Sequence, residues 1–372
     1  MNRFIYTSRT FLLLTALLGL SLYPIRISAN ELIADTTIMI QLRKGIDLVY
    51  NYEFAEAEET LEILKLNYPD HPVTPFFKGL IYYWKYYPLV PDKPGSEDFE
   101  RLMEKSWKRA HTLKESNSEI EGVFFDLMAR SFVVMYHADN GKSSRAISHM
   151  GPIYRDILKG FEMQDDFTEF MFITGLYNYY REAFPEAYPV YKPALIFFRK
   201  GDKEEGLKML RDAAFETDFM KVEAALFLSL IHINFENNPD SALWYAEYLH
   251  KEYPGNAFFH SKHTEMLLIN RQYDQALMQI DSMMKLDSYN QMKSTVYRGI
   301  HEEKGMRDLE KARNLYEKGL RLAEPYGERA NYTKAYAYIG LSRYYSYKDD
   351  KRKAREYYKK AKNSTGYSYV FD

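Results

Sequence analysis

One segment with the same pattern occurs five times along the chain and constrains the fold more than any other feature. In each copy an alanine lies within a charged run of helical character, and a proline or a polar turn often follows about a dozen residues later. The five alanines are Ala57, Ala242, Ala276, Ala312 and Ala354. A pattern that returns in this way is typical of stacked helical hairpins, in which each unit packs against its neighbours.

The spacing of apolar residues and of turn residues predicts eight helical hairpins. In the first hairpin, Ala57, Leu61 and Leu64 share one face of a helix that Pro69 ends. The expected pairs cover residues 37–50 with 54–66, 75–87 with 97–113, 119–137 with 143–161, 167–184 with 202–215, 221–234 with 240–250, 256–269 with 273–285, 291–303 with 308–322, and 332–347 with 351–362. No long linker separates them, so residues 30–372 are expected to form one continuous domain.

The repeated segment resembles the second helix and exit turn of the tetratricopeptide repeat, and the resemblance covers most of residues 37–362. The family's early tryptophan is missing, and the second to fourth hairpins carry long loops between their helices. The resemblance implies an all-α, right-handed superhelical solenoid whose first helices line a concave groove. It also implies that an exported bacterial protein of this kind binds its partner in that groove.

Residues 185–201 form an insertion between the two helices of the fourth hairpin. The insertion contains three prolines and a strongly apolar tail, and it reads PEAYPVYKPALIFFRKG. Two interpretations are open. The segment either fills a groove by packing or acts as a functional flap, since long ordered loops are often functional.

The first 29 residues have the pattern of a secretory signal peptide. Arg3 and Arg9 precede the apolar run 11–20, and Ala29 is a small residue before the expected cleavage. The run is short for a membrane span, although an uncleaved anchor is the alternative. With no cysteine in the chain, disulfides and a lipid-bearing cysteine are excluded. We therefore expect a periplasmic or secreted protein that is soluble after cleavage.

Composition and motifs favour a protein without catalytic activity. The formal net charge is -2, and no basic run suggests nucleic acid as a partner. We find no glycine-rich phosphate loop and no nucleophile elbow, and we expect no cofactor. His260 and His263 lie three residues apart beside Glu265, but a third strong ligand is missing, so no metal site is predicted.

An aromatic pattern follows a glycine on three of the expected first helices. The segments 79–84, 175–180 and 340–345 read GLIYYW, GLYNYY and GLSRYY. Tyrosine and tryptophan offer large rigid contact areas, so part of each set is predicted to face the groove. The alternative is that the rings pack hairpin against hairpin. The candidate binding residues are Tyr83, Trp84, Lys85, Tyr179, Tyr180, Arg181, Tyr344 and Tyr345.

These features favour a non-catalytic interaction scaffold of the cell envelope that binds a peptide or a partner protein in an aromatic groove. A glycan-binding protein is the alternative, because aromatic rings also stack on sugars, and Asn178 lies near one aromatic set. We expect no nucleic-acid partner and no stable membrane insertion once the signal is cleaved.

Overall fold

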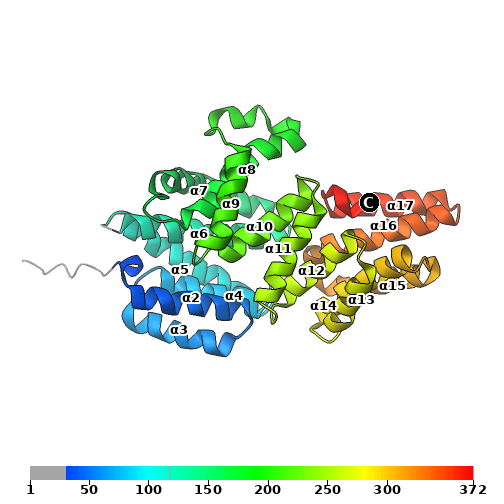
Figure 1. Ribbon diagram of the computed structural model, residues 1–372, viewed down its shortest axis with the longest axis horizontal. Coiled ribbons are helices and arrows are strands. Elements are labelled where there is room, and N and C mark those ends of the chain that lie inside the picture. The colour runs from blue at the N-terminus through cyan, green and yellow to red at the C-terminus, as the bar shows by residue number, and fades with distance from the viewer. Residues whose placement is uncertain (1–30, 117, 372) are drawn as a thin grey trace, which may run out of the picture.

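The computed structural model describes residues 31–116 and 118–371, and these residues fold into helices joined by short turns (Figure 1). Within those ranges no β-strand occurs, so the all-α prediction is confirmed. The expected signal peptide at 1–29 lies outside the described residues. Among the described helices, none is both long enough and apolar enough to cross a membrane.

The helices pair as eight consecutive hairpins, and each expected helix falls on an observed one. In chain order the pairs are α2 (Thr36–Tyr50) with α3 (Phe54–Asn67), α4 (Val73–Lys85) with α5 (Ser96–Lys114), α6 (Glu119–Asp139) with α7 (Ser143–Met163), α8 (Phe170–Ala187) with α9 (Lys203–Glu216), α10 (Lys221–Asn234) with α11 (Pro239–Glu252), α12 (Ala257–Ile269) with α13 (Tyr273–Met283), α14 (Ser288–Ile300) with α15 (Leu309–Ala323), and α16 (Asn331–Tyr347) with α17 (Lys351–Ser364). Short helical turns η1 (Leu32–Ala34), η2 (Pro189–Tyr191), η3 (Ala194–Phe197), η4 (His301–Gly305), η5 (Glu324–Ala330) and η6 (Ser368–Phe371) complete the described chain.

The repeated alanines and the caps explain why the hairpins form where they do. Ala57, Ala242 and Ala276 are fully buried on second helices, where a larger side chain would hold the helix pair apart. Several second helices begin at an acidic or amide N-cap. The side chain of Asp202, for example, accepts a hydrogen bond from the Glu205 amide at the start of α9.

The solenoid winds tightly enough that its first turn contacts repeats about 200 residues later. The side-chain amide of Asn256, at the start of α12, donates to the carbonyl of Tyr50 at the end of α2. The Tyr253 hydroxyl donates to Asp47, and the Gly255 amide donates to the side chain of Asn51. These contacts place the fifth and sixth hairpins against the first.

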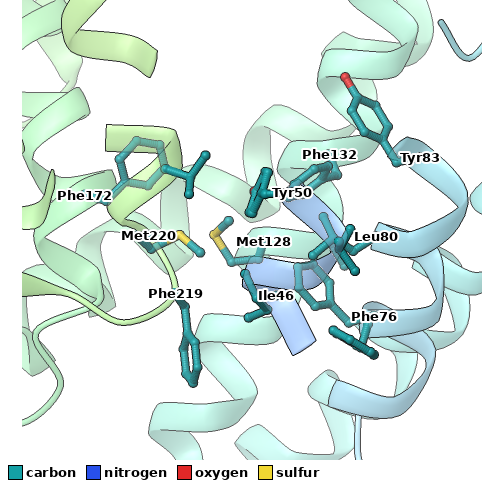
Figure 2. Packing of buried hydrophobic residues seen from close by; sticks show 14 of the residues in the cluster. Ile46, Tyr50, Phe76, Leu80, Tyr83, Met128, Phe132, Phe172, Phe219 and Met220 are labelled. Carbon is teal, nitrogen blue, oxygen red and sulfur yellow. The ribbon is translucent and has the colours of Figure 1, made fainter. Parts of the chain in front are cut away.

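The first helices of the amino-terminal half converge on one filled core. Figure 2 shows side chains of α2, α4, α6 and α8 meeting residues at the start of α10, with Tyr50, Phe76, Phe132 and Phe172 among them. The residual cavity between these elements is about 20 Å³. A space of this size holds about one water molecule and admits no peptide.

The insertion at 185–201 projects from the body of the molecule. The helix α8 continues through Pro185 to Ala187, and η2 and η3 follow as a compact excursion at the top of Figure 1. Val190, Ile196 and Phe197 on this excursion are strongly exposed. These three side chains therefore face solvent and fill no groove.

Candidate functional site

The structure places most of the predicted aromatic site in the core. Tyr83 is buried against Phe99 and Phe132. Trp84 is buried against Tyr50 and the rings of Phe258 and Phe259. Lys85 is exposed and pairs with Glu58 on the neighbouring helix.

The second and third copies of the aromatic pattern are engaged in a similar way. Tyr179 is fully buried and its hydroxyl contacts Glu236, whereas Tyr180 is half-buried against Phe235. The guanidinium of Arg181 donates to the Leu195 carbonyl at 2.8 Å. Tyr344 is buried and donates to Glu310, and the half-buried Tyr345 stacks on Tyr357.

The expectation of an open groove lined by these rings is corrected by the winding of the solenoid. Phe258 and Phe259 of α12 occupy the space beside Trp84 that a partner would need. Tyr87, just past α4, meets Tyr289 of α14 across the same interior. The hairpin-packing alternative therefore describes Tyr83, Trp84 and Tyr179.

An open cavity lies instead in the carboxy-terminal half, on the side of the first helices. Its volume is about 210 Å³. The walls come from the first helices α10, α12, α14 and α16, with the α12–α13 turn and η6 at the edge; residues that line it include Ile233, Glu265, Leu268, Tyr297, Tyr336 and Arg343. The cavity thus lies along first helices, and none of the eight predicted binding residues is among those that line it.

A buried carboxylate organises the polar wall of this cavity. Glu265 is almost fully buried and accepts a hydrogen bond from the Tyr336 hydroxyl at 2.9 Å. The Tyr332 hydroxyl contacts the same oxygen, and the ammonium of Lys262 lies 3.0 Å from the other. Burial and the nearby carboxylate raise the pKa of the Tyr336 phenol well above its usual value, so the phenol stays protonated as a donor.

A buried lysine, Lys293, lies beside this network. The ammonium of Lys293 donates to the Ser261 hydroxyl at 3.0 Å and lies over the ring of Tyr289 at 4.9 Å. Burial lowers the pKa of Lys293 to about 7, and the positive charge of Lys262 adds to the effect. A lysine with such a pKa changes charge near neutral pH, yet the side chain faces the core instead of the cavity.

Tyr369 and Val370, near the end of the described chain, line one side of the cavity. The turn η6 contacts both α10 and α16, which belong to hairpins three units apart. Val370 is buried, and Tyr369 packs with Ile233 and Met266 while its hydroxyl contacts that of Tyr332. The segment thus inserts an aliphatic and an aromatic side chain beside the Glu265 network.

A cation with one donor atom that no described residue satisfies also lines the cavity. Arg343 forms a two-point ion pair with Glu303, at 2.5 and 3.0 Å. Among the described residues, its buried Nη1 atom has no hydrogen-bond partner. A carboxylate or carbonyl oxygen entering the cavity would satisfy that donor.

A second polar cluster lies away from this cavity. In a cleft between α5, α6 and α7, Lys114 pairs with Asp126 and Asp156 at 2.7 Å. Burial raises the pKa of Asp156 to about 6, although Lys114 opposes the effect. Lys114 thus pairs with both carboxylates, and Arg130 pairs with Asp126 as well.

The predicted histidine pair is joined by a third imidazole. His250 stacks on His260 and His263, with ring centroids 4.6 and 5.2 Å away. Burial lowers the pKa values of His260 and His263 to about 4. In the described part of the chain, no group of three or more histidine or acidic side chains has the arrangement needed to hold a metal ion.

Sequence reasoning missed Tyr332, Tyr336 and Tyr369, and it treated Glu265 as a neighbour of the histidines. One signal was present, because Tyr332 and Tyr336 lie four residues apart and therefore share a helix face. Their common partner Glu265 is about 70 residues away, and no local pattern connects the two segments. No family model matches the sequence, and no curated protein matches it.

Proposed function

We propose that this protein is a non-catalytic interaction scaffold that binds an extended peptide segment of a partner in the cavity formed by α10, α12, α14 and α16. The single observation behind the proposal is the chain's own segment 366–371, whose Tyr369 and buried Val370 complete one wall of that cavity. The tetratricopeptide resemblance supports the same function, since it implies peptide binding along first helices.

The chemistry of the cavity indicates which peptides would fit. Apolar walls from Ile233, Leu268 and Ile300 suit a branched aliphatic side chain. The Glu265 carboxylate and its tyrosine partners suit a hydroxyl or amide donor, while Arg343 suits a peptide carbonyl or carboxylate. We therefore expect a partner segment that combines an aromatic hydroxyl with an aliphatic residue and competes with residues 366–371.

The proposal is tested by dislodging the chain's own segment and offering it back as a peptide. The variant Val370→Asp places a charge in an apolar position and should release the segment. A labelled peptide with the sequence of residues 366–372 should then bind this variant, measured by fluorescence anisotropy. Binding to the native chain should be roughly tenfold weaker or more, because a tethered segment competes at high effective concentration.

The matched control is Val190→Asp, the same substitution at an exposed valine, which should behave as the native chain does. Circular dichroism checks that both variants are folded. If the peptide binds neither the folded Val370→Asp variant nor the native chain, the cavity is not a peptide site and the proposal fails.

Glycan binding is retained as a second candidate because one aromatic platform is exposed. The indole of Trp244 on α11 is about half exposed and stacks nearly parallel on Tyr248, with an interplanar angle of 4°. Asp240 precedes Trp244 by one helical turn and supplies an acceptor for sugar hydroxyls. Titration calorimetry with envelope oligosaccharides should show binding that Trp244→Ala abolishes and Trp107→Ala leaves intact; absence of heat would exclude this candidate.

We also propose that the protein is exported. The support is the signal-like pattern of residues 1–29 and the absence of cysteine from the whole sequence. Mass spectrometry of the protein from separated cell fractions should find a chain that begins at Asn30 outside the cytoplasm. A chain that retains residues 1–29 in the membrane fraction would support the uncleaved anchor instead.

A further inference from the structure

The excursion between α8 and α9, residues 188–200, exposes a concentrated set of apolar side chains. Val190 is 79 % exposed, Ile196 75 % and Phe197 89 %. These three lie on or beside the turns η2 and η3, which project from the helical body (Figure 1). Isolated exposed apolar residues are normal, but a projecting cluster of them marks a contact surface.

The base of this excursion is held firmly, so the apolar tip has a defined position. The Tyr177 hydroxyl donates to the Arg199 carbonyl at 2.6 Å, and the Arg199 amide donates to the Tyr154 hydroxyl at 3.0 Å. The Phe198 ring packs edge-on against Tyr154. From α8, Arg181 bonds to the Leu195 carbonyl. The chain therefore orders the backbone of the excursion while leaving Ile196 and Phe197 in solvent.

All charged residues of the excursion are basic. Lys192, Arg199 and Lys200 lie in it, and no acidic residue occurs from 187 to 201. All three basic side chains belong to exposed residues, and the Arg199 guanidinium also lies over the Phe161 ring. A projecting apolar tip with basic residues beside it matches a lipid interface, where apolar groups enter the acyl boundary and cations meet headgroup phosphates.

We propose that residues 188–200 dock the protein on an anionic lipid surface, with Val190, Ile196 and Phe197 entering the interface and Lys192 and Lys200 pairing with phosphate groups. The charge complementarity and the convex shape favour this occupant over a protein, which would need a matching apolar pocket. The docking is peripheral and uses none of the residues that line the cavity of the proposed peptide site. Either proposal can therefore fail without affecting the other.

The experiment uses one fluorescent label attached to an introduced cysteine. Because the native sequence has no cysteine, the label attaches at that position alone. The variant Val190→Cys is labelled with a polarity-sensitive fluorophore and mixed with vesicles of phosphatidylglycerol and phosphatidylcholine. The emission should shift to the blue as the label enters the interface. The reporter at position 190 responds to its own surroundings, and a label elsewhere on the surface shows how much shift residues 1–29 would produce by holding the chain at the vesicle.

Two changes in the labelled background test the two parts of the surface. Replacing Ile196 and Phe197 with serine should weaken vesicle binding roughly tenfold or more, because two buried apolar side chains are lost. Replacing Lys192 and Lys200 with glutamine should weaken it by roughly fivefold for each charge, an effect that high salt should reproduce in the unsubstituted chain.

The matched control carries the label at Leu66→Cys, an equally exposed apolar position on α3. A blue shift at 190 and none at 66 supports the proposal. No shift at 190, equal shifts at both positions, or an equal shift with pure phosphatidylcholine would overturn it. A shift at 190 that grows with protein concentration without vesicles would assign the surface to a second copy of the chain and would also overturn it.

Discussion

The ring of Tyr316 on α15 lies between two glycines that belong to different first helices. A Cβ atom at Gly299 of α14 would lie 2.6 Å from the ring, and one at Gly340 of α16 would lie 2.1 Å from it. The Tyr316 hydroxyl also donates to Glu303 at 2.6 Å. The ring is therefore held at both of its edges and at its tip, so a larger side chain at either glycine would be overpacked against it.

We expect Gly340→Ala to lower the free energy of unfolding by about 2 kcal/mol. Overpacking against a ring that cannot move costs about 3 kcal/mol, the upper end of the usual range. The higher helix propensity of alanine offsets about 1 kcal/mol of this loss. Urea unfolding followed by circular dichroism measures the difference. Gly366→Ala, where no atom lies within 4 Å of the added carbon, should change stability by less than about 0.5 kcal/mol.

The buried histidines make stability depend on pH. The folded state lowers the pKa values of His260 and His263 to about 4 from 6.5, because burial disfavours the charged imidazole. His250 faces both rings, while Glu247 and Lys251 act on His263. The unfolded chain therefore binds more protons below pH 6.5, and the stability contributed by the neutral imidazoles is lost as the pH falls from 6.5 towards 4.

We expect the native chain to lose on the order of 3 kcal/mol more stability between pH 7 and pH 4 than the double variant His260→Gln, His263→Gln. The comparison between chains cancels the opposite contribution of Glu169 and Glu223, whose pKa values burial raises to about 7. If the free energy of unfolding changed with pH in the same way in the two chains, the folded state would not lower the pKa values of these imidazoles.

At the scale of helices, the same residue type has two different roles at two helix starts. Asn238 caps α11 by accepting from the Ser241 amide, and its side chain is exposed. Asn256 caps α12 by accepting from the Phe258 and Phe259 amides, and its amide group also donates to the Tyr50 carbonyl of α2. The second asparagine thus joins the first hairpin to the sixth.

We expect Asn256→Ala to cost about 3 kcal/mol of stability and Asn238→Ala about 1 kcal/mol. Both variants lose a helix cap worth about 1 kcal/mol, and only Asn256→Ala leaves a buried carbonyl without a donor, which costs about 1–3 kcal/mol more. Denaturant midpoints of the two variants measure the difference. Equal losses would show that the contact between the first and sixth hairpins adds nothing.

At the scale of the whole molecule, the first helices of both halves share one interior. Trp84 of α4 contacts Tyr50 of α2 and the rings of Phe258 and Phe259 in α12. Packing therefore couples the two halves. The loss of one of these rings should destabilise both of them.

We expect Trp84→Ala to cost about 3–5 kcal/mol, the usual range for removing a buried aromatic side chain. Hydrogen exchange should show weaker amide protection in both α2 and α12. The matched change Trp244→Ala, at a half-exposed indole, should cost less than about 1 kcal/mol. Protection lost only in α4 would mean that the halves unfold independently.

The sequence alone determined the helices, their order and their pairing. Helices depend on signals that act within a few residues of chain, so a local pattern is enough to predict them. These signals are periodic apolar residues, buried small residues such as Ala57 and Ala276, and caps such as Asp202. It also singled out the insertion 185–201 by its three prolines and apolar tail, although α8 continues through the first of these prolines to Ala187.

The tertiary structure alone decided which face is open. Tyr83 and Trp84 lie on a first helix as expected, yet they are buried because the tight winding brings α12 into the space before them. The cavity beside Glu265 depends on tyrosines about 70 residues away and on the segment 366–371. Curvature is the sum of many small rotations between neighbouring hairpins, and no short stretch of sequence specifies that sum.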